Sequence, residues 1–508
     1  MRLDALLFDD ELAGDDLDAA LLHFGPRSWT RGDLQHQAEA LRSELVRIGV
    51  GTGHAVAVML DNGPEPVAAL FGVWRTGAVH VPLNPRLPGA EVTHILDSVD
   101  PVAVVTTAGH AVRLSDQFAG RPIVITAVDE WSTAAEVDHP EARQHDPDVA
   151  LIQFTSGTTG RPKPVLLLHS GVLTLLDGVL AKLRSGTTPS SAKPGPPRSP
   201  MPNLIPVSLS LWAGIYNVLF AFRVGAPVVI MDGFDPAEFR ALVARFEIRS
   251  TVLPPAAMTM LTDDPAITDL APLRFVRSIT APLSPLQARR FKDRFAVAVL
   301  NSYGQTEIGG EIVGWNAADS RQHGEDKLGS VGRPHAGVTV RVVDDDDHDV
   351  PVSEPGELWV QTPALSAGYA DGGDLSDRMS EDGWFRTGDY ARVDEDGFVW
   401  IEGRVSSMIN RGGLKVYPGE VEEVIRLHPS VADVAVVGGP DDRLGEVPWA
   451  FVVARQAAPA AAELTELCRA HLAPYKVPVR FEVIDDLPRN EVGKVLAREL
   501  IERFGASS

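Results

Sequence analysis

The chain contains little cysteine, and this shortage excludes several kinds of stabilised or metal-binding protein. Cys468 is the single cysteine among its 508 residues. One cysteine can form neither an intrachain disulfide nor a cysteine-based zinc site. This composition suits a reducing compartment, and the N-terminal residues turn acidic too early for a signal peptide. We therefore expect a cytoplasmic protein.

Basic residues are also scarce relative to acidic ones. The chain has 46 lysines and arginines against 69 aspartates and glutamates, which gives a formal net charge of −23. Such a charge repels polyanions and excludes a nucleic-acid-binding function. The acidic run at 344–347 lacks the spacing of a calcium-binding loop, so we expect a solvated turn there.

Long hydrophobic segments are absent as well. The longest apolar stretch, 214–231, is interrupted by Asn217, Arg223 and Pro227. A membrane-spanning helix needs roughly 20 consecutive apolar residues. The stretch therefore predicts a buried helix followed by a strand, and no membrane span.

The chain does contain a regular alternation of elements, and it is long enough for at least two domains. Helical patterns at 31–48 and 65–74 alternate with strand-like patterns at 54–60 and 78–83. Such alternation predicts an α/β domain with parallel sheets covered by helices.

From residue 329 the pattern changes to short antiparallel strands, and a boundary is expected near Arg404. Residues 405–508 have the pattern of a small α+β domain, so we divide the chain into domains 1–404 and 405–508. Inside the first domain, 184–200 is rich in proline and serine and predicts a mobile surface loop. An inert linker is the favoured role of this loop, and a lid or a partner-docking segment is the alternative.

The most informative segment is 154–163, with the sequence FTSGTTGRPK, which follows an apolar strand. Its glycines let backbone N–H groups approach an oxyanion, its hydroxyls donate hydrogen bonds, and its lysine adds a positive charge. The segment lacks the spacing of a Walker loop, and a flexible surface turn is the alternative. Its length and order favour a loop that grips a triphosphate. The candidate residues are Thr155, Ser156, Gly157, Thr158, Thr159, Gly160 and Lys163.

Two further segments carry side chains suited to a nucleotide. In the segment 301–307, NSYGQTE, Tyr303 offers a flat face for adenine, Thr306 a hydroxyl for a phosphate, and Glu307 a carboxylate for Mg²⁺. Asp389, which closes the sequence RTGD, is a suitable acceptor for both ribose hydroxyls. Either segment alone could be an ordinary turn.

Together these segments resemble the adenylate-forming superfamily of acyl-CoA synthetases, aryl-CoA ligases, peptide adenylation domains and beetle luciferases. Five matches follow the family's order between Arg31 and Arg498, and this order is far more specific than any single motif. The resemblance implies a large N-terminal domain of two αβ layers plus a distorted β-barrel, followed by a small mobile α+β domain.

The resemblance also implies roles for residues that the patterns alone do not explain. Arg404 matches an arginine that contacts the nucleotide, and Gly412 and Gly413 match a turn that lines the pantetheine tunnel. Lys494 matches a catalytic lysine that neutralises charge during adenylation. We expect catalytic roles for Lys494, Glu307 and Thr306, with Glu307 as the metal ligand. The remaining nucleotide-site candidates are Ala281, Asn301 and Gly304.

The chain departs from the family's usual pattern at several positions. Pro164 follows the lysine of the first motif where glycine is usual, and Ser406 occupies a hinge position usually held by Asp or Lys. Ile279 and Thr280 replace a usual glycine pair, so we expect a reshaped acyl pocket. Leu209 stands near the place of an aromatic or histidine gate.

The implied reaction has two steps, in which a carboxylate attacks ATP to form acyl-AMP and a thiol then captures the acyl group. The expected small molecules are ATP, Mg²⁺, CoA and a carboxylic acid. Residues 203–212 contain no acidic side chain to hold an ammonium, which disfavours amino-acid activation. We expect an apolar site for a fatty, alicyclic or aryl acid. Its candidate lining residues are Val207, Leu209, Trp212 and Thr280.

Three alternatives remain open on the sequence. The acceptor could be an acyl-carrier protein instead of CoA, or the chain could be a catalytically impaired binding homologue. Luciferase-type oxidation is a remote further alternative.

Overall fold

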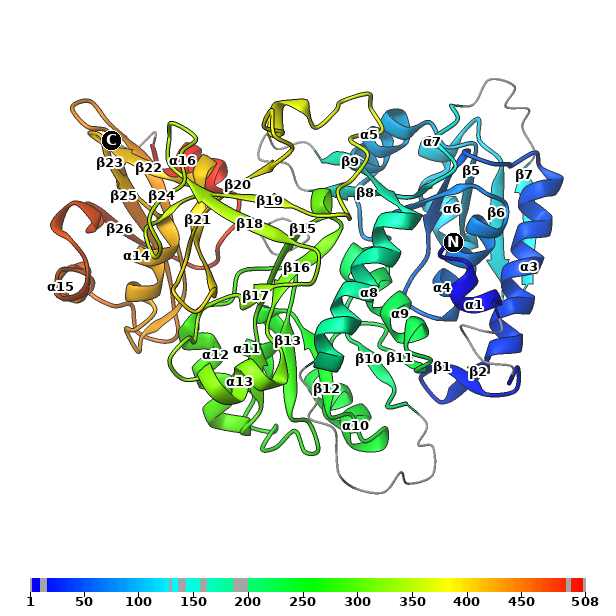
Figure 1. The fold of residues 1–508 in the computed structure, drawn as a ribbon, viewed down its shortest axis with the longest axis horizontal. Coiled ribbons are helices and arrows are strands. Elements are labelled where there is room, and N and C mark those ends of the chain that lie inside the picture. Colours follow the sequence, from blue (N-terminus) through cyan, green and yellow to red (C-terminus); the bar gives the residue numbers. More distant parts are fainter. Residues whose placement is uncertain are drawn as a thin grey trace.

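The computed structural model describes residues 2–9, 16–127, 130–135, 143–155, 162–185, 200–489 and 495–505. Figure 1 shows a large body on the right, formed by the first part of the chain, and a smaller body on the left, formed by its last part. The strands β18 to β21 lie between the two bodies.

A seven-stranded sheet with the order β7-β6-β5-β3-β4-β8-β9 forms the first αβ layer. Its inner strands pair in parallel, whereas β7 and β9 pair antiparallel at the two edges. The strands are β3 (Ala55–Met59), β4 (Val79–Pro82), β5 (Ala103–Thr107), β6 (Ile123–Ala127), β7 (Glu130–Ala135), β8 (Val149–Thr155) and β9 (Lys163–Leu168).

The helices of this layer bury the faces that the sequence pattern predicts. Helix α3 begins after Thr30, whose side chain forms a capping box with Asp33. Its leucines Leu34, Leu41 and Leu45, which follow the helical spacing, are fully buried against the sheet layer. The helices are α3 (Arg31–Arg47), α4 (Pro64–Arg75), α5 (Gly89–Val99), α6 (Ala108–Arg113) and α7 (Ser115–Phe118).

A second αβ region contains two smaller sheets, β10-β11-β1-β2 and β12-β13-β14. Their strands are β1 (Ala20–Phe24), β2 (Arg27–Thr30), β10 (Asn203–Ile205), β11 (Val228–Ile230), β12 (Ser250–Leu253), β13 (Phe275–Ser278) and β14 (Ala298–Leu300). The helices of this region are α1 (Ala5–Phe8), α8 (His169–Ser185), α9 (Trp212–Arg223), α10 (Pro236–Arg245), α11 (Pro255–Asp263), α12 (Pro285–Phe295) and α13 (Ala317–His323).

The predicted buried helix and strand at 214–231 are confirmed as α9 and β11. Helix α9 is buried on most of its circumference because it packs inside the large hydrophobic core. In the described part of the chain, no helix has both the length and the apolar character needed to cross a bilayer.

Antiparallel strands follow, and they begin at Ser302, earlier than residue 329, where the sequence pattern changes. One sheet has the order β15-β16-β17 and another β18-β19-β20-β21. The strands are β15 (Ser302–Gln305), β16 (Gly310–Gly314), β17 (Arg333–Pro334), β18 (Thr339–Val343), β19 (Gly356–Gln361), β20 (Phe385–Val393) and β21 (Val399–Arg404).

The C-terminal part has a separate sheet and its own small core. Strand β21 ends at Arg404. The short 3₁₀ helix η3 spans Val405–Ser407, and the next sheet begins at Ile409. The elements are β22 (Ile409–Arg411), β23 (Leu414–Val416), α14 (Pro418–Ile425), β24 (Val431–Asp441), β25 (Gly445–Ala454), α15 (Ala461–His471), β26 (Arg480–Ile484) and α16 (Ala497–Gly505). The exact domain division near Arg404 stays a prediction.

Candidate functional site

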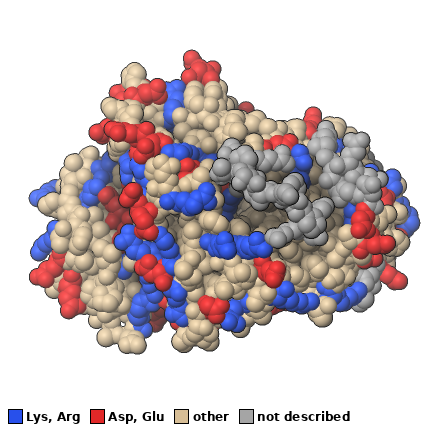
Figure 2. All heavy atoms as spheres, turned by 60° about the horizontal axis from the view of Figure 1, so that its bottom comes forward, with Lys and Arg blue, Asp and Glu red and all other residues tan. Residues whose placement is uncertain are grey.

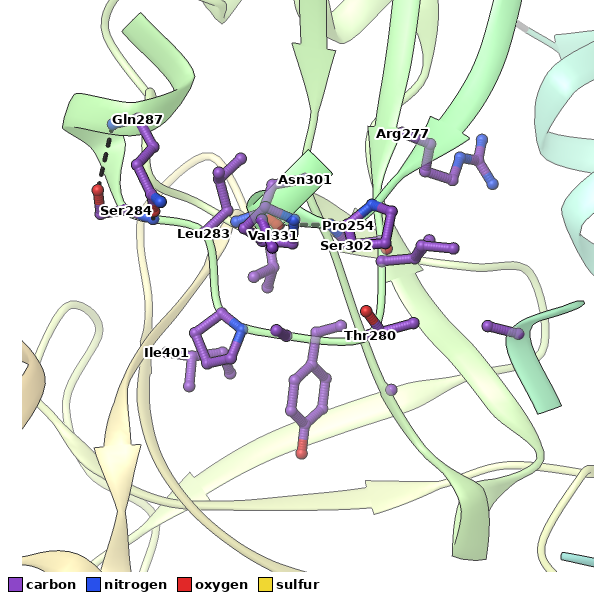
Figure 3. A pocket seen from close by; sticks show the side chains of 18 of the residues that line it. Pro254, Arg277, Thr280, Leu283, Ser284, Gln287, Asn301, Ser302, Val331 and Ile401 are labelled. Atoms are coloured by element: carbon purple, nitrogen blue, oxygen red, sulfur yellow. Dashed lines mark hydrogen bonds between the residues drawn. The ribbon is translucent and has the colours of Figure 1, made fainter. Parts of the chain in front are cut away.

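A large cavity lies where the two bodies meet. Its volume is about 2520 Å³, and its walls come from α9, β13, β15 and β20 on one side and from α14 and β24 on the other. Figure 3 shows part of this cavity, with Thr280 and Leu283 on the loop after β13 and Ile401 on β21. On the face drawn in Figure 2, side chains of both charges are interspersed, so attraction for a phosphate-bearing ligand has to come from individual site residues.

Asp389 is the centre of a buried polar network in this cavity. Its Oδ2 accepts hydrogen bonds from the Tyr303 hydroxyl at 2.5 Å and from Gln305 Nε2 at 2.6 Å. Its Oδ1 lies 2.7 Å from Nε of Arg404. The network joins β20, β15 and the end of β21, so three segments that the sequence analysis assigned to one nucleotide site do converge.

The electrostatics of this network are unusual for a carboxylate beside an arginine. Burial raises the pKa of Asp389, although the charge of Arg404 and the hydrogen bonds from Tyr303 and Gln305 oppose the shift. Burial, together with the nearby carboxylate, raises the pKa of Tyr303 well above its ordinary value. Tyr303 is therefore a neutral donor, and Asp389 carries a charge that little solvent stabilises.

Glu307 and Thr306 lie beside this network, in the short 3₁₀ helix η1 (Thr306–Ile308) that follows β15. Nη1 of Arg378 lies 3.3 Å from Oε1 of Glu307, and Nη2 of Arg378 donates to Oε1 of Gln305 at 3.1 Å. Arg378 thereby joins the predicted metal ligand to the residue that supports Asp389.

The first motif forms the connection between β8 and β9. Thr155 and Lys163 are directly paired across these antiparallel strands, so they stand at the base of the loop. Both line the cavity, and the Lys163 ammonium lies 5.1 Å from the centre of the Tyr369 ring. Five loop candidates lie outside the described residues, namely Ser156, Gly157, Thr158, Thr159 and Gly160.

Pro164 is compatible with its position because β9 is the edge strand of its sheet. Its carbonyl accepts a hydrogen bond from the Ala370 N–H at 2.8 Å, which fastens the segment 367–370 along the outer side of β9. Proline can therefore replace the glycine that is usual at residue 164, because this edge position needs no backbone N–H donor.

Asn301, Ala281 and Gly304 also line the cavity, as predicted for a nucleotide site. A Cβ atom on Gly304 would lie only 1.8 Å from the carbonyl oxygen of Gly310. Glycine is thus required at residue 304 by the close pairing of β15 and β16. Thr280, also in the lining, has φ = 72°, a left-handed conformation that is strained for a β-branched residue.

Two of the predicted glycines are not brought to the cavity. Gly412 and Gly413 form the tight turn between β22 and β23, with φ values of 60° and 91°. These positive values at both central positions are those of a two-residue hairpin turn. Neither glycine is part of the cavity lining.

Lys494 lies outside the described residues, as does most of the predicted loop 184–200. The residues that flank Lys494 are informative, since Arg489 and Val495 both line the cavity. Arg489 and Val495 thus belong to the lining of the same cavity as Asp389, whereas Gly412 and Gly413 do not.

A magnesium ion fits the chemistry of Glu307. Mg²⁺ in nucleotide sites commonly takes one or two protein carboxylates, with phosphate oxygens and waters completing its shell. Glu307 supplies one carboxylate in the cavity, and in the described part of the chain no group of three or more His, Cys, Asp or Glu side chains forms a metal cage. A metal held here by the single Glu307 carboxylate would take its other ligands from the phosphates with which it binds. Arg378 would remain paired with the same carboxylate.

Sequence reasoning missed Gln305, Arg378 and the charged residues Arg277 and Glu311 of the lining. Gln305 stands inside the second motif, where it looks like a spacer. Arg277 and Glu311 interrupt the apolar strands β13 and β16, and a charge in a buried strand is a usable signal for an internal ion pair. Of the predicted acyl-site residues, Val207, Trp212 and Thr280 line the cavity, whereas Leu209 is buried in the adjacent core.

Comparison with known proteins decides the family. The family model described as AMP-binding enzyme matches residues 8–370, and the model described as AMP-binding enzyme C-terminal domain matches residues 420–494. The chain belongs to the AMP-binding enzyme family. The predicted resemblance to adenylate-forming enzymes is confirmed.

Curated relatives of this AMP-binding enzyme cover nearly its whole length. It is 31% identical to a fatty acid–[acyl-carrier-protein] ligase, ScoC, of Streptomyces coeruleorubidus, over 95% of this chain and 93% of the relative. It is also 31% identical to a feruloyl-CoA synthase of an Amycolatopsis species, over 96% of each chain.

The fold is shared with solved structures of the same kind. The ATP-bound crystal structure of MatB from Rhodopseudomonas palustris matches with a TM-score of 0.86 and 26% identity, over 99% of both chains. The amide bond synthetase McbA from Marinactinospora thermotolerans matches with a TM-score of 0.85 and 26% identity, over 99% of both chains. The predicted fold, a large α/β N-terminal domain with a small C-terminal domain, is confirmed.

Replacing Gly304 by alanine tests the close pairing at the site. The new Cβ would force β15 away from β16, and we expect Gly304→Ala to lower the free energy of unfolding by about 2 kcal/mol. Thermal or urea unfolding measures this loss. Gly233→Ala is the control, because a Cβ at Gly233 meets no atom within 4 Å. Equal stability of the two variants would contradict the proposed contact.

Replacing Asp389 by asparagine separates function from stability. Because the pKa of Asp389 is raised in the folded state, its ionisation reduces stability as the pH rises through that pKa. We expect Asp389→Asn to melt at the same or a higher temperature than the wild type at pH 8, with the difference shrinking toward acidic pH.

The same variant should bind ATP poorly, because loss of a charged hydrogen-bond acceptor costs about 1.5–3 kcal/mol, or roughly 10- to 100-fold in affinity. Calorimetry and the KM for ATP measure this effect. The exposed Asp442→Asn is the control and should change neither quantity. A less stable Asp389→Asn variant with unchanged ATP affinity would reject the assignment.

Proposed function

We propose that the protein is an AMP-forming acid–thiol ligase. It joins a carboxylic acid to ATP, which gives an acyl-adenylate and pyrophosphate, and then transfers the acyl group to the thiol of CoA with release of AMP. The proposal agrees with the family, to which the similar ScoC carrier-protein ligase and feruloyl-CoA synthase also belong by their whole-length likeness to this chain.

One observation supports this function above the others. Segments from three distant parts of the chain line a single cavity: the β8–β9 hairpin base, β15 with η1, and the neighbouring strands β20 and β21. In one cavity they supply the Asp389 carboxylate as an acceptor for ribose hydroxyls, the Tyr303 ring for a base, and the Lys163 cation for phosphates. In the described part of the chain we find no arrangement of Ser, His and Asp around this cavity that would serve a covalent mechanism.

Each residue has a separate task in the first step. Asp389 would accept hydrogen bonds from the ribose hydroxyls, with Arg404 and Gln305 holding its carboxylate in position. Tyr303 would lie against the base. Lys163 and Thr155 would bind the phosphate end, where positive charge and hydroxyl donors stabilise the leaving pyrophosphate.

Glu307 is the proposed magnesium ligand, and the metal when bound would neutralise charge on the phosphate oxygens. Arg378 would hold the Glu307 carboxylate through their 3.3 Å ion pair. Thr306 would donate to a phosphate oxygen from the adjacent position. Lys494 would neutralise the charge that develops between the acid and the α-phosphate.

The second step requires the C-terminal domain to change its orientation. In the present orientation Arg489 and Val495 line the cavity, and Gly412 and Gly413 do not. The contacts between domains suit such a movement, because Lys415–Asp345 at 2.8 Å and Arg455–Asp263 at 3.4 Å are solvent-exposed ion pairs. Such pairs contribute about 0–1 kcal/mol each.

The decisive experiment is a panel of carboxylic acids assayed for AMP release with ATP, Mg²⁺ and CoA. Fatty, alicyclic and aryl acids form the panel, and at least one should give acid-dependent AMP and an acyl-CoA of the expected mass. Replacing CoA with an unacylated carrier protein that bears a free phosphopantetheine thiol tests the other acceptor. AMP release and pyrophosphate exchange that are absent with every acid would instead indicate an impaired binding homologue.

Replacing Lys494 by alanine tests the two orientations. We expect Lys494→Ala to slow adenylation at least about 100-fold, because it removes a charge that stabilises the transition state. Thioester formation from supplied acyl-adenylate should be largely retained. Single-turnover assays of each half-reaction measure both rates. The exposed Arg498→Ala is the control, and an equal loss in both half-reactions for Lys494→Ala would reject the assignment.

A further inference from the structure

A buried ion pair lines the cavity on the side of β13 and β16. Nη1 of Arg277 lies 3.0 Å from Oε1 and 3.2 Å from Oε2 of Glu311. Glu311 also accepts a hydrogen bond from Nε2 of His335 if that nitrogen carries the proton, at 3.0 Å. Figure 3 shows the Arg277 guanidinium on the side of the pocket away from Ser284 and Gln287. The predicted apolar pocket therefore contains a polar cluster.

The charges of this cluster are nearly balanced. Burial would raise the pKa of Glu311, but Arg277, the His335 hydrogen bond and Lys182 outweigh burial and hold the pKa at about 2. Burial lowers the pKa of His335, which keeps its ring neutral. Glu311 is thus an anion at neutral pH, and its charge is compensated by the guanidinium beside it.

Tyr216 of α9 completes the cluster. Its side chain lines the same cavity, and its hydroxyl is buried without a hydrogen-bond partner among the described residues. Its ring packs edge-on against Trp212, with 5.8 Å between the ring centres, and this contact holds the ring in place. A buried hydroxyl that lacks a partner costs about 1–3 kcal/mol, so its presence in a ligand cavity indicates that a ligand satisfies it.

Arg277 has unused donors as well. Among the described residues only its Nη1 contacts Glu311, so Nε and Nη2 can donate to a group in the cavity. Two hydrogen-bond donors thus line the same cavity. The Tyr216 hydroxyl is neutral, and the charge of the Arg277 guanidinium is compensated by Glu311. The chemistry that satisfies both is an oxygen atom that accepts hydrogen bonds.

The position of this cluster relates it to the acyl group and not to the nucleotide. Gly304 pairs directly with Glu311 across β15 and β16, whereas the side chains on either side of Gly304 reach Asp389. The nucleotide network and the polar cluster therefore flank the same hairpin, and Asp389 and Arg277 line the same cavity. An acid whose carboxyl meets the nucleotide would extend toward Arg277 and Tyr216.

We propose that the acid carries a neutral hydrogen-bond-accepting oxygen, such as a hydroxyl or an ether, at the end remote from its carboxyl group, and that Tyr216 and Arg277 determine this specificity. The proposal rests on the ligase function proposed above. A second carboxylate is disfavoured, because it would be buried beside the Glu311 anion and like charges repel strongly in a site of low dielectric. A purely apolar end would leave the two donors without partners.

Matched aryl acids test the proposal. Three acids that differ only at the remote position, with a methoxy, a methyl or a carboxylate group, are compared by kcat/KM for AMP release by the full-length enzyme. We expect the methoxy acid to exceed the methyl acid by about tenfold or more, in line with the cost of unpaired buried donors. The carboxylate acid should be the poorest of the three.

Variants assign the preference to named side chains. Tyr216→Phe keeps the ring and its packing, and it should reduce the methoxy-to-methyl ratio toward one. Tyr475→Phe, a tyrosine in the C-terminal domain away from the cavity, is the matched control and should leave the ratio unchanged. Glu311→Gln removes the compensating anion, so it should raise the relative kcat/KM of the carboxylate acid.

The outcomes are distinguishable. AMP release with equal kcat/KM for the methoxy and methyl acids, or a ratio that Tyr216→Phe does not change, overturns this proposal and leaves the ligase function intact. If the wild-type enzyme prefers the carboxylate acid, the pocket recognises an anion and not a neutral oxygen, and this result also overturns the proposal. Absence of AMP release with every acid of the broad panel overturns the ligase function, and this proposal with it.

Discussion

The buried carboxylate of Asp389 is the constraint on which the site depends. A charge in a poorly solvated position needs several partners, and here they come from two strands. Tyr303 and Gln305 lie on β15, far from Asp389 in the sequence, and Arg404 ends β21, which pairs with β20. The same requirement fixes the distance between the β15–β16 hairpin and the β18–β21 sheet. Since Arg404 is also the last residue of β21, the carboxylate connects the nucleotide site to the point where the chain passes toward the C-terminal domain.

Much of the fold could be predicted from sequence because its signals are local. Helix α3 is marked by its capping residues and by apolar residues at helical spacing, and the buried helix α9 was predicted from the apolar stretch 214–231. The motif residues Tyr303, Asp389 and Arg404 could be placed in one site because their order resembles a family. Their mutual contacts could not, because distances between segments some 80 residues apart depend on packing that no local pattern encodes.

The residues that sequence reasoning missed share one physical property, which is that their role depends on a partner far away in the chain. Arg378 looks like a surface residue until its contact with Glu307 is known, and Arg277 gains meaning only from Glu311. The glycines are the reverse case, in which a motif match is not accompanied by a contact with the cavity. Gly412 and Gly413 resemble a tunnel motif, yet in this orientation they serve as the turn of a hairpin, and their proposed role requires a movement of the domain.

The strain at Thr280 and the polar cluster concern the same pocket. Thr280 keeps a left-handed conformation in which glycine would be unstrained, and such strain costs on the order of 1–3 kcal/mol. Thr280 lines the cavity, and the buried Arg277–Glu311 pair makes part of the same lining polar. Strain and buried charge both reduce stability, and both are tolerated where a ligand contributes binding energy. Their occurrence around one cavity supports the proposal that this pocket recognises the acid by its shape and polarity.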